Sequence, residues 1–351
     1  MAATMADTTA TAATGRADSA SRLHLPPFVR SAEEGLRTLD EYGLCVHEAF
    51  LTAEQVARLK ERLIEQAELE CEQGVALLSG QSRGGKTWYG RPDPGHVPGW
   101  QGIAALYNKG RVFIDLALEP LFAQYGKQVF RGASFHLSSM TGLIVRRGAE
   151  PMVVHVDQQF MPITEVPTYL NCMVCLVDFE EKMGATRVVP KSHRGPYPKQ
   201  AFDAQRGVYN PEPIETVAVE APAGSAIFFE SRTWHQSGIS TSDKTRYSIS
   251  ALWQQSWVKP MDNIVENLHD DVYASLSERE LEVLGFKAEP SGRVEARSPG
   301  ARQNTNRKTP YVPELRRGGD KRAVALEDMG DRKSAADEAK AMGLDTAKRA
   351  T

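Results

Sequence analysis

Two stretches in the first half of the chain repeat apolar residues at the spacing of an amphipathic helix. The first covers residues 54–72, where charged residues fill the positions between the apolar ones. Its apolar positions are Val56, Leu59, Leu63 and Ala67. The second covers residues 110–126 and contains Pro120, which interrupts a helix because proline lacks a backbone N–H. The pattern predicts one continuous and one interrupted helix, the first of them packed against the outside of a sheet.

From residue 133 onward the pattern changes to short apolar runs of strand length. The runs cover residues 133–145, 152–160, 169–178, 185–190, 214–219, 225–229 and 246–256. We therefore predict a mainly β fold with flanking helices and a double-stranded β-helix core, the jelly-roll or cupin-like architecture. Residues 76–104 hold seven glycines and three prolines, and we expect them to cover the mouth of this core.

Composition limits the predicted ordered part to one domain. Residues 1–27 contain no aromatic residue and are rich in Ala, Thr and Ser, which predicts a disordered segment. Residues 288–351 contain a single aromatic residue, Tyr311, among many charged ones, which predicts a flexible charged tail. The intervening residues 28–287 are enough for one jelly-roll domain.

Charge and cysteine content bound the partners and the compartment. The net charge of −3 is too small to favour nucleic acid or an anionic membrane surface as a partner. Four cysteines without a regular framework and the lack of a long apolar stretch predict a soluble cytoplasmic protein. The Ala/Thr/Ser-rich start leaves organelle import open. The sequence also leaves open whether the protein forms a homo-oligomer.

The candidate chemistry centres on His155 and Asp157. Side chains alternate along a strand, so residues two apart place an imidazole and a carboxylate on one face. His235 follows an apolar run that a sheet could bring back beside this pair. Two histidines and one carboxylate suit a non-haem Fe(II) site, because they leave positions open for O₂ and a co-substrate. Arg246 lies eleven residues later, where its guanidinium could bind a carboxylate in bidentate fashion.

With these residues the chain resembles the phytanoyl-CoA dioxygenase family of Fe(II)/2-oxoglutarate-dependent oxygenases. The resemblance runs from about residue 35 to residue 257. Residues 39–44 and 49–56 resemble the opening strand and helix of that family. Residues 184–193, Gly-Ala-Thr-Arg-Val-Val-Pro-Lys-Ser-His, are similar to its turn and strand between the metal-binding halves.

The resemblance implies a role for each matching residue. His155, Asp157 and His235 match the iron ligands, and Arg246 matches the residue that pairs with the distal carboxylate of 2-oxoglutarate. Two further co-substrate contacts are implied, at Thr186 and Lys109. Some members carry a glutamine where this chain has Met152, so its co-substrate pocket is expected to be lined differently. The retained Asp157 argues against halogenation, which relatives perform with a small residue at that position.

The implied activity is oxidation of an unactivated C–H position of a small hydrophobic or natural-product substrate, with Fe(II), 2-oxoglutarate and O₂, and with release of succinate and CO₂. Hydroxylation is the leading interpretation, and desaturation, epoxidation and cyclisation stay open. Five apolar or aromatic residues are candidates for the substrate mouth, each with core packing as an equal alternative: Phe135, Met140, Phe160, Met161 and Trp253. A jelly-roll protein that binds metal or ligand without turnover is the alternative function.

Three other patterns have structural interpretations. Cys172 and Cys175 form a C-x-x-C, but positions three apart on a strand face opposite ways, which favours two core cysteines. His193 is expected to make a structural hydrogen bond. Residues 80–87 match G-x-x-x-x-G-K-[ST], yet the following Pro- and Gly-rich stretch cannot form the helix that a phosphate-binding loop needs. Nucleotide binding there is the weakest alternative.

Overall fold

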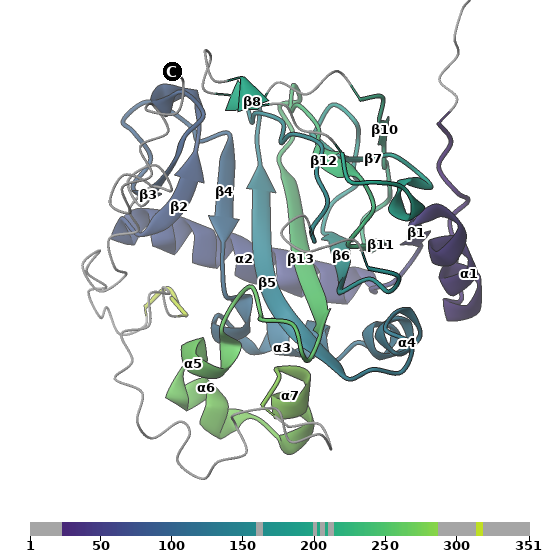
Figure 1. The fold of residues 1–351 in the computed structure, drawn as a ribbon. Coiled ribbons are helices and arrows are strands. Elements are labelled where there is room, and N and C mark those ends of the chain that lie inside the picture. The colour runs from purple at the N-terminus through teal and green to yellow at the C-terminus, as the bar shows by residue number, and fades with distance from the viewer. Residues whose placement is uncertain are drawn as a thin grey trace, which may run out of the picture.

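Two antiparallel β-sheets face each other, and helices cover the outer face of the larger one (Figure 1). The computed structural model describes residues 23–158, 164–198, 202–203, 208–209, 214–286 and 314–318. The major sheet has the order β1 (Leu44–His47), β11 (Ala226–Glu230), β6 (Tyr169–Cys175), β13 (Arg246–Gln255), β5 (Phe135–Val145), β4 (Trp100–Ile103), β2 (Ala76–Ser79) and β3 (Thr87–Gly90). The minor sheet has the order β10 (Val217–Ala218), β7 (Thr186–Val188) and β12 (His235–Ser237). The predicted fold class is confirmed.

The two faces of the major sheet pack into separate cores. Alternate residues of β6 and β13, among them Val174 and Ile249, join the core beneath the helices. The opposite face contributes Met173 and Cys175 to a second core, which also contains Val188 of the minor sheet. Because side chains alternate along a strand, each residue of β6 and β13 can be assigned to the helix side or to the space between the sheets.

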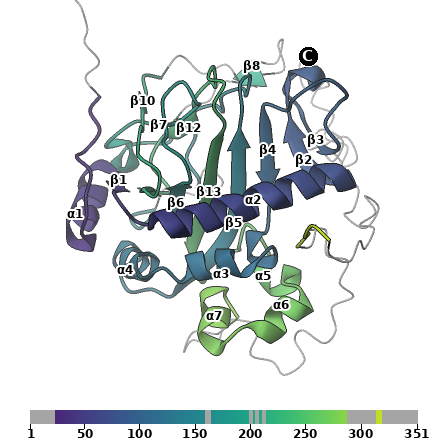
Figure 2. The same cartoon turned by 180° about the vertical axis from the view of Figure 1, so that it is seen from behind.

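The longest helix, α2 (Ala53–Gln73), crosses the back of the major sheet (Figure 2). It matches the predicted helix over residues 54–72. The side chain of Thr52 caps its first turn, and it ends at Gly74, which adopts φ +77°, a value that glycine reaches without strain. Charged residues on its exposed face keep it amphipathic. In the part of the chain that the structure describes, no helix combines the length and apolar character needed to cross a membrane.

The interrupted helix is also confirmed, and it ends slightly later than expected. It forms α3 (Arg111–Ala117) and α4 (Pro120–Val129), with Pro120 in the first turn of α4, where its missing N–H costs nothing. Three short helices follow the last strand: α5 (Ile264–Asn267), α6 (Asp270–Ser275) and α7 (Glu278–Val283). A two-stranded pair, β8 (Phe202–Asp203) and β9 (Val208–Tyr209), completes the described elements.

The expected opening strand over residues 39–44 is wrong. Most of this segment belongs to α1 (Ala32–Tyr42), which begins at a capping box formed by Ser31 and Glu34. The helix ends at Gly43, whose φ is +78° and where an added Cβ would lie 2.5 Å from the Thr233 hydroxyl. The strand β1 begins only at Leu44, after this turn.

Residues 76–104, which we expected to cover the mouth of the core, contain three strands that the sequence pattern did not predict, and β2, β3 and β4 extend the major sheet. Four-residue strands separated by glycine-rich loops are too short for a clear alternation pattern. Residues 80–87 connect β2 to β3, and the Gly85 N–H donates to the Gly80 carbonyl at 3.0 Å. A strand follows this loop where a phosphate-binding loop needs a helix, which argues against nucleotide binding.

The two ends of the chain lie largely outside the described residues, so the predicted disordered start and flexible tail stay predictions. Leu25 packs against the core between the sheets. Residues 314–318 contact α2: the Leu315 N–H donates to the Gln66 side chain at 2.9 Å, and Arg317 pairs with Glu68 at 2.6 Å.

Candidate active site

The structure brings His155, Asp157 and His235 together. His155 and His235 form an isolated antiparallel bridge, with backbone N–H···O distances of 2.9 and 3.0 Å, and their ring centroids lie 4.3 Å apart. One donor atom from each of the three side chains lies within 4.8 Å of the other two. Of the predicted strand over residues 152–160, the structure describes residues 152–158, which form only this bridge before the chain turns at Asp157 and Gln158. A single backbone pairing therefore sets the spacing of the two imidazoles.

Backbone carbonyls fix the orientation of both imidazole rings. The Nδ1 atom of His155 lies 2.9 Å from the Val153 carbonyl oxygen, and the Nδ1 atom of His235 lies 2.9 Å from that of Thr233. A carbonyl oxygen only accepts, so Nδ1 carries the proton in both rings. The Nε2 atoms keep their lone pairs, as histidine ligands of metals require.

Electrostatics keep the carboxylate of Asp157 ionised. Burial alone would raise its pKa, but His235, His155 and a hydrogen bond from Asn171 together lower it. For His155, burial and the neighbouring His235 lower the pKa. At His235 burial opposes the charged form, but Asp157, with its Oδ1 atom 3.5 Å from Nε2, raises the pKa. Two imidazoles and one carboxylate in this arrangement form a donor set that fits Fe(II).

Arg246 supplies a buried positive charge on the face of the major sheet that is turned toward the space between the sheets. It begins β13, and its side chain is 2% exposed. Its Nε and Nη1 atoms have no hydrogen-bond partner among the described residues, while the guanidinium lies over the Phe179 ring. Burial lowers its pKa to about 10, so it stays charged at neutral pH. A buried cation without an anion is costly, which makes the site suited to a ligand carboxylate.

Strand β13 relates Arg246 to the histidine and aspartate cluster. Alternation places Ser248 and Ser250 on the same face as Arg246. The Ser250 hydroxyl donates to the Asn171 side chain at 3.0 Å, and the Asn171 amide donates to Asp157 at 3.2 Å. Ser250 is four residues from Arg246, a distance of about 13 Å along a strand. Arg246 and the groups that lead to Asp157 therefore lie on the same face of the major sheet.

Thr186 lies on the facing sheet. It is buried in β7, opposite Ser237 of β12, and it shares the inward side of the strand with Val188. Met152 is different, because its side chain is 56% exposed, while its N–H donates to the Ser237 hydroxyl at 2.9 Å. Thr186 thus reaches the space between the sheets, and Met152 does not fill it.

Lys109 is not brought to this site. Its side chain is buried, and its ammonium donates to Glu70 of α2 at 2.7 Å, on the helix-covered side of the major sheet. The expected contact with 2-oxoglutarate is therefore not supported. The residues around Lys109 gave no sign that Glu70, 39 residues earlier, would be its partner.

We expect Lys109→Met to destabilise the protein without affecting co-substrate binding. The substitution leaves Glu70 as a buried carboxylate without its cation, which costs about 3–5 kcal/mol. Thermal unfolding should therefore shift down while the KM for 2-oxoglutarate stays at its wild-type value. Pairing it with Glu70→Gln should recover part of the stability. If the KM for 2-oxoglutarate rises several-fold in a folded Lys109→Met protein, Lys109 does contact the co-substrate.

Three of the residues considered for the substrate mouth pack in the helix-side core: Phe135, Met140 and Trp253. Phe160 and Met161 lie outside the described residues. Alternation along the strand explains why Trp253 packs on the helix side. It is an odd number of residues from Arg246 and Ser250 on β13, so its side chain points to the opposite face. On the inner face, Tyr169, Leu252 and Val258 form a small apolar group that is separate from the core between the sheets.

The other structural interpretations are confirmed. Cys172 belongs to the helix-side core and Cys175 to the core between the sheets, and both are free thiols. The Nε2 atom of His193 lies 3.0 Å from the Asp40 carbonyl oxygen, and the ring is buried. Sequence reasoning missed Asn171 and Ser250. The available signal was an asparagine within the otherwise apolar strand Tyr169–Cys175.

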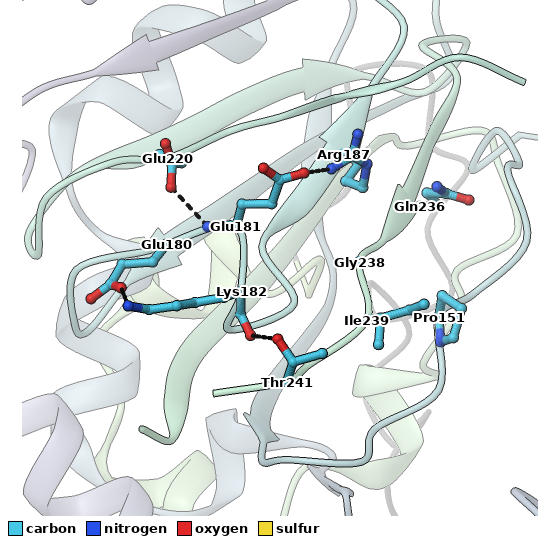
Figure 3. A pocket seen from close by; sticks show the side chains of 10 residues that line it. All are labelled: Pro151, Glu180, Glu181, Lys182, Arg187, Glu220, Gln236, Gly238, Ile239 and Thr241. Atoms are coloured by element: carbon cyan, nitrogen blue, oxygen red, sulfur yellow. Dashed lines mark hydrogen bonds and ion pairs between the residues drawn. The ribbon is translucent and has the colours of Figure 1, made fainter. Parts of the chain in front are cut away.

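An open pocket of about 690 Å³ lies against the minor sheet (Figure 3). It is lined by Pro151, Glu180, Glu181, Lys182, Arg187, Glu220, Gln236, Gly238, Ile239 and Thr241. Its charged groups pair with one another, Glu181 with Arg187 and Glu180 with Lys182. Arg187 alternates with the inward-facing Thr186 and Val188, so this pocket is on the outer side of β7. It is separate from the histidine and aspartate cluster.

Comparisons with known proteins identify the family of the chain. Residues 39–248 match the phytanoyl-CoA dioxygenase (PhyH) family. Dioxygenase trt7 of Aspergillus terreus is 25% identical over 245 residues, which cover 67% of this chain and 77% of that protein. Multifunctional dioxygenase prhA of Penicillium brasilianum is 25% identical over 281 residues, which cover 76% of this chain and 87% of that protein.

Solved structures share the fold. The epimerase SnoN, in complex with Fe³⁺, alpha ketoglutarate and nogalamycin RO, superposes with a TM-score of 0.51 at 20% identity, over 68% of this chain and 90% of that chain. The alpha ketoglutarate dependent carbocyclase SnoK from nogalamycin biosynthesis gives a TM-score of 0.50 at 19% identity, over 68% of this chain and 96% of that chain.

The fold and the family match define the protein as an Fe(II)/2-oxoglutarate-dependent oxygenase. The chain belongs to the phytanoyl-CoA dioxygenase family, whose enzymes use Fe(II), 2-oxoglutarate and O₂.

Proposed function

We propose that this oxygenase binds Fe(II) through His155, Asp157 and His235 and oxidises a C–H bond of a small, largely apolar natural product. The single observation that carries the assignment is the cluster of three donor atoms within 4.8 Å, with both Nδ1 protons already donated to carbonyls. Bound Fe(II), together with 2-oxoglutarate and O₂, supplies the oxidising power for this step, and the co-substrate leaves as succinate and CO₂. Hydroxylation, in which one oxygen atom enters the substrate, is the reaction we favour.

Arg246 binds the distal carboxylate of 2-oxoglutarate in this proposal. What supports the role is a buried guanidinium that stays charged and lacks an anion among the described residues. A bidentate contact would satisfy its donors and set the direction in which the co-substrate lies. Thr186, buried on the facing strand, is the proposed hydrogen-bonding partner on the other sheet. Excluding water from this space strengthens both contacts.

We place the substrate on the inner face of the major sheet, toward the end of β13 that lies away from Arg246. Leu252 is two residues beyond Ser250 on β13, and Tyr169 is two residues before Asn171 on β6. Both therefore share the inner face with the Asn171–Ser250 pair and pack with Val258 in a cluster separate from the two large cores. Trp257 is exposed beside this cluster in sequence. Apolar side chains at this position support an apolar substrate surface.

A coupled assay tests the proposed function. Purified protein with Fe(II), ascorbate, O₂ and 2-oxoglutarate is screened against terpenoids, polyketides and fatty acyl compounds, and succinate is quantified alongside the oxidised product. We expect at least one apolar natural product to raise succinate formation stoichiometrically with a product that carries one added oxygen atom. If the metal-loaded protein forms no succinate above a no-enzyme control in any reaction, the proposed turnover is wrong.

Leu252→Ala should weaken use of the substrate found in that screen. Loss of an apolar contact of this size costs about 1.5 kcal/mol, or about a tenfold drop in kcat/KM. The KM for 2-oxoglutarate should not change, because Leu252 lies away from Arg246 on β13. Met140→Ala, which removes a buried apolar side chain on the helix side, is the matched control. Equal losses in both variants would mean that Leu252 acts only through stability.

A further inference from the structure

A chain of hydrogen bonds ends on one oxygen of Asp157. The Asn171 amide nitrogen donates to Oδ2 at 3.2 Å, and the Ser250 hydroxyl donates to the Asn171 amide oxygen at 3.0 Å. The orientation of the amide follows from the chemistry of its neighbours. An ionised carboxylate only accepts, so Asn171 presents its NH₂ to Asp157, and its oxygen then needs the hydroxyl of Ser250 as a donor. In this chain Ser250 is therefore a donor, Asn171 is both acceptor and donor, and Asp157 is the final acceptor.

The two oxygens of Asp157 therefore differ. Oδ2 is engaged by Asn171, while Oδ1 lies 3.5 Å from the Nε2 atom of His235, the lone pair of which faces the cluster. Oδ1 is the oxygen placed to join the two imidazole nitrogens. A carboxylate that used both oxygens would take up one more coordination position.

Building these contacts into the sheet has a cost. Asn171 is 8% exposed and lies between Leu170 and Cys172, which are fully buried in the helix-side core. A methionine or valine, like others in the same strand, would fill this position without the need for hydrogen bonds. The asparagine and serine meet across neighbouring strands, where Leu252 of β13 is the residue opposite Asn171. Their positions are fixed by the sheet and not by a flexible loop.

We propose that Asn171, held by Ser250, is a positioning residue that keeps Asp157 a one-oxygen ligand. This rests on the proposed metal site. With two histidines and one carboxylate oxygen as ligands, three of six positions stay open, which is the number that a bidentate co-substrate and O₂ require together. By engaging Oδ2, Asn171 keeps that oxygen from occupying one of these three open positions.

Binding of Mn(II) to the full chain tests the inference without a substrate. Groups that orient a metal ligand contribute about 10–100-fold in affinity, so Asn171→Ala should weaken Mn(II) binding by that factor. Water-proton relaxation of the bound Mn(II) should also report fewer exchangeable waters, because Oδ2 becomes free to bind. Ser250→Ala should change both quantities in the same direction and by less. The double variant should add little to Asn171→Ala, since Ser250 acts through Asn171.

Gln101→Leu is the matched control for loss of a buried amide. The Gln101 side chain donates to the Ala67 carbonyl at 2.9 Å on the helix side of the sheet, so its loss should lower the melting temperature and leave Mn(II) binding unchanged. If a folded Asn171→Ala protein binds Mn(II) with wild-type affinity and hydration, the role of Asn171 is overturned, while the metal site is not. If the wild-type protein binds no Mn(II), or binds it equally in His235→Ala, the metal site itself is overturned.

Discussion

Asp157→Ala is expected to abolish turnover and to weaken metal binding by more than about a hundredfold. Groups that merely orient a ligand already contribute about 10–100-fold, and Asp157 supplies the only carboxylate of the three-residue cluster among the described residues. Its removal leaves two imidazoles, and the negative charge that balances a divalent cation is lost. Metal affinity by isothermal titration and succinate formation with Fe(II) measure the two effects.

Asp178→Ala provides the control for Asp157→Ala. Asp178 lies just beyond β6, seven residues after Asn171, and its carboxylate accepts the Ala223 N–H at 2.8 Å. Its loss should affect stability only. Wild-type succinate formation by a folded Asp157→Ala protein would show that this carboxylate is not a ligand.

Arg246→Leu is expected to raise the KM for 2-oxoglutarate steeply. Loss of a charge-assisted bidentate contact costs on the order of 2–4 kcal/mol, which corresponds to roughly 30- to 1,000-fold. Stability of the free protein should not fall, and it is expected to rise, because the guanidinium is buried without a partner among the described residues. The same reasoning predicts that 2-oxoglutarate raises the melting temperature of the metal-loaded wild type and not that of the variant.

Arg146→Leu separates this effect from the general loss of an arginine. Arg146 follows β5, next to the strand that Arg246 begins, and it donates to the Gln101 side chain at 3.2 Å. It should leave the KM for 2-oxoglutarate unchanged. An unchanged KM in Arg246→Leu would place the distal carboxylate of the co-substrate elsewhere.

The sequence predicted that His155, Asp157 and His235 come together, because few residue types bind iron and the spacing of these three was informative. His155 and Asp157 are two residues apart. Val154, just before the pair, and Val156, between the two residues, are buried, as alternation along a strand requires. In the described part of the predicted strand over residues 152–160, only a bridge at His155 forms, since the chain turns at Asp157. The three side chains still come together, because their arrangement depends on this one backbone bridge to His235.

Pairings between distant residues could not be read from the sequence. Lys109 and Glu70 are 39 residues apart and belong to different elements, so a lysine near the expected site was assigned to it. Trp253 and Met140 were candidates for the mouth because apolar residues on a two-sided strand look alike. Once the limits of β13 are known, counting residues from Arg246 shows which side chains of this strand face the helices and which face the space between the sheets.

Short elements escaped prediction for a related reason. Strands β2, β3 and β4 have four residues each and stand between glycines and prolines, so their local pattern resembles a loop. Pairing with β5 makes β4 a strand, and that pairing is a long-range contact. Helix α1 was missed although Ser31 and Glu34 form a capping box, because the apolar Leu39 and Leu44 were read as part of one strand.

The most direct test of the account is an anaerobic titration of the Fe(II)-loaded protein with 2-oxoglutarate, followed by visible absorption. Chelation of Fe(II) by the 2-oxo acid is expected to produce a weak metal-to-ligand charge-transfer band in the wild type. The band should require far more 2-oxoglutarate in Arg246→Leu and should be lost in His235→Ala. An iron-loaded wild-type protein that shows no band at saturating 2-oxoglutarate, or a His235→Ala protein that keeps it, would contradict the proposed site.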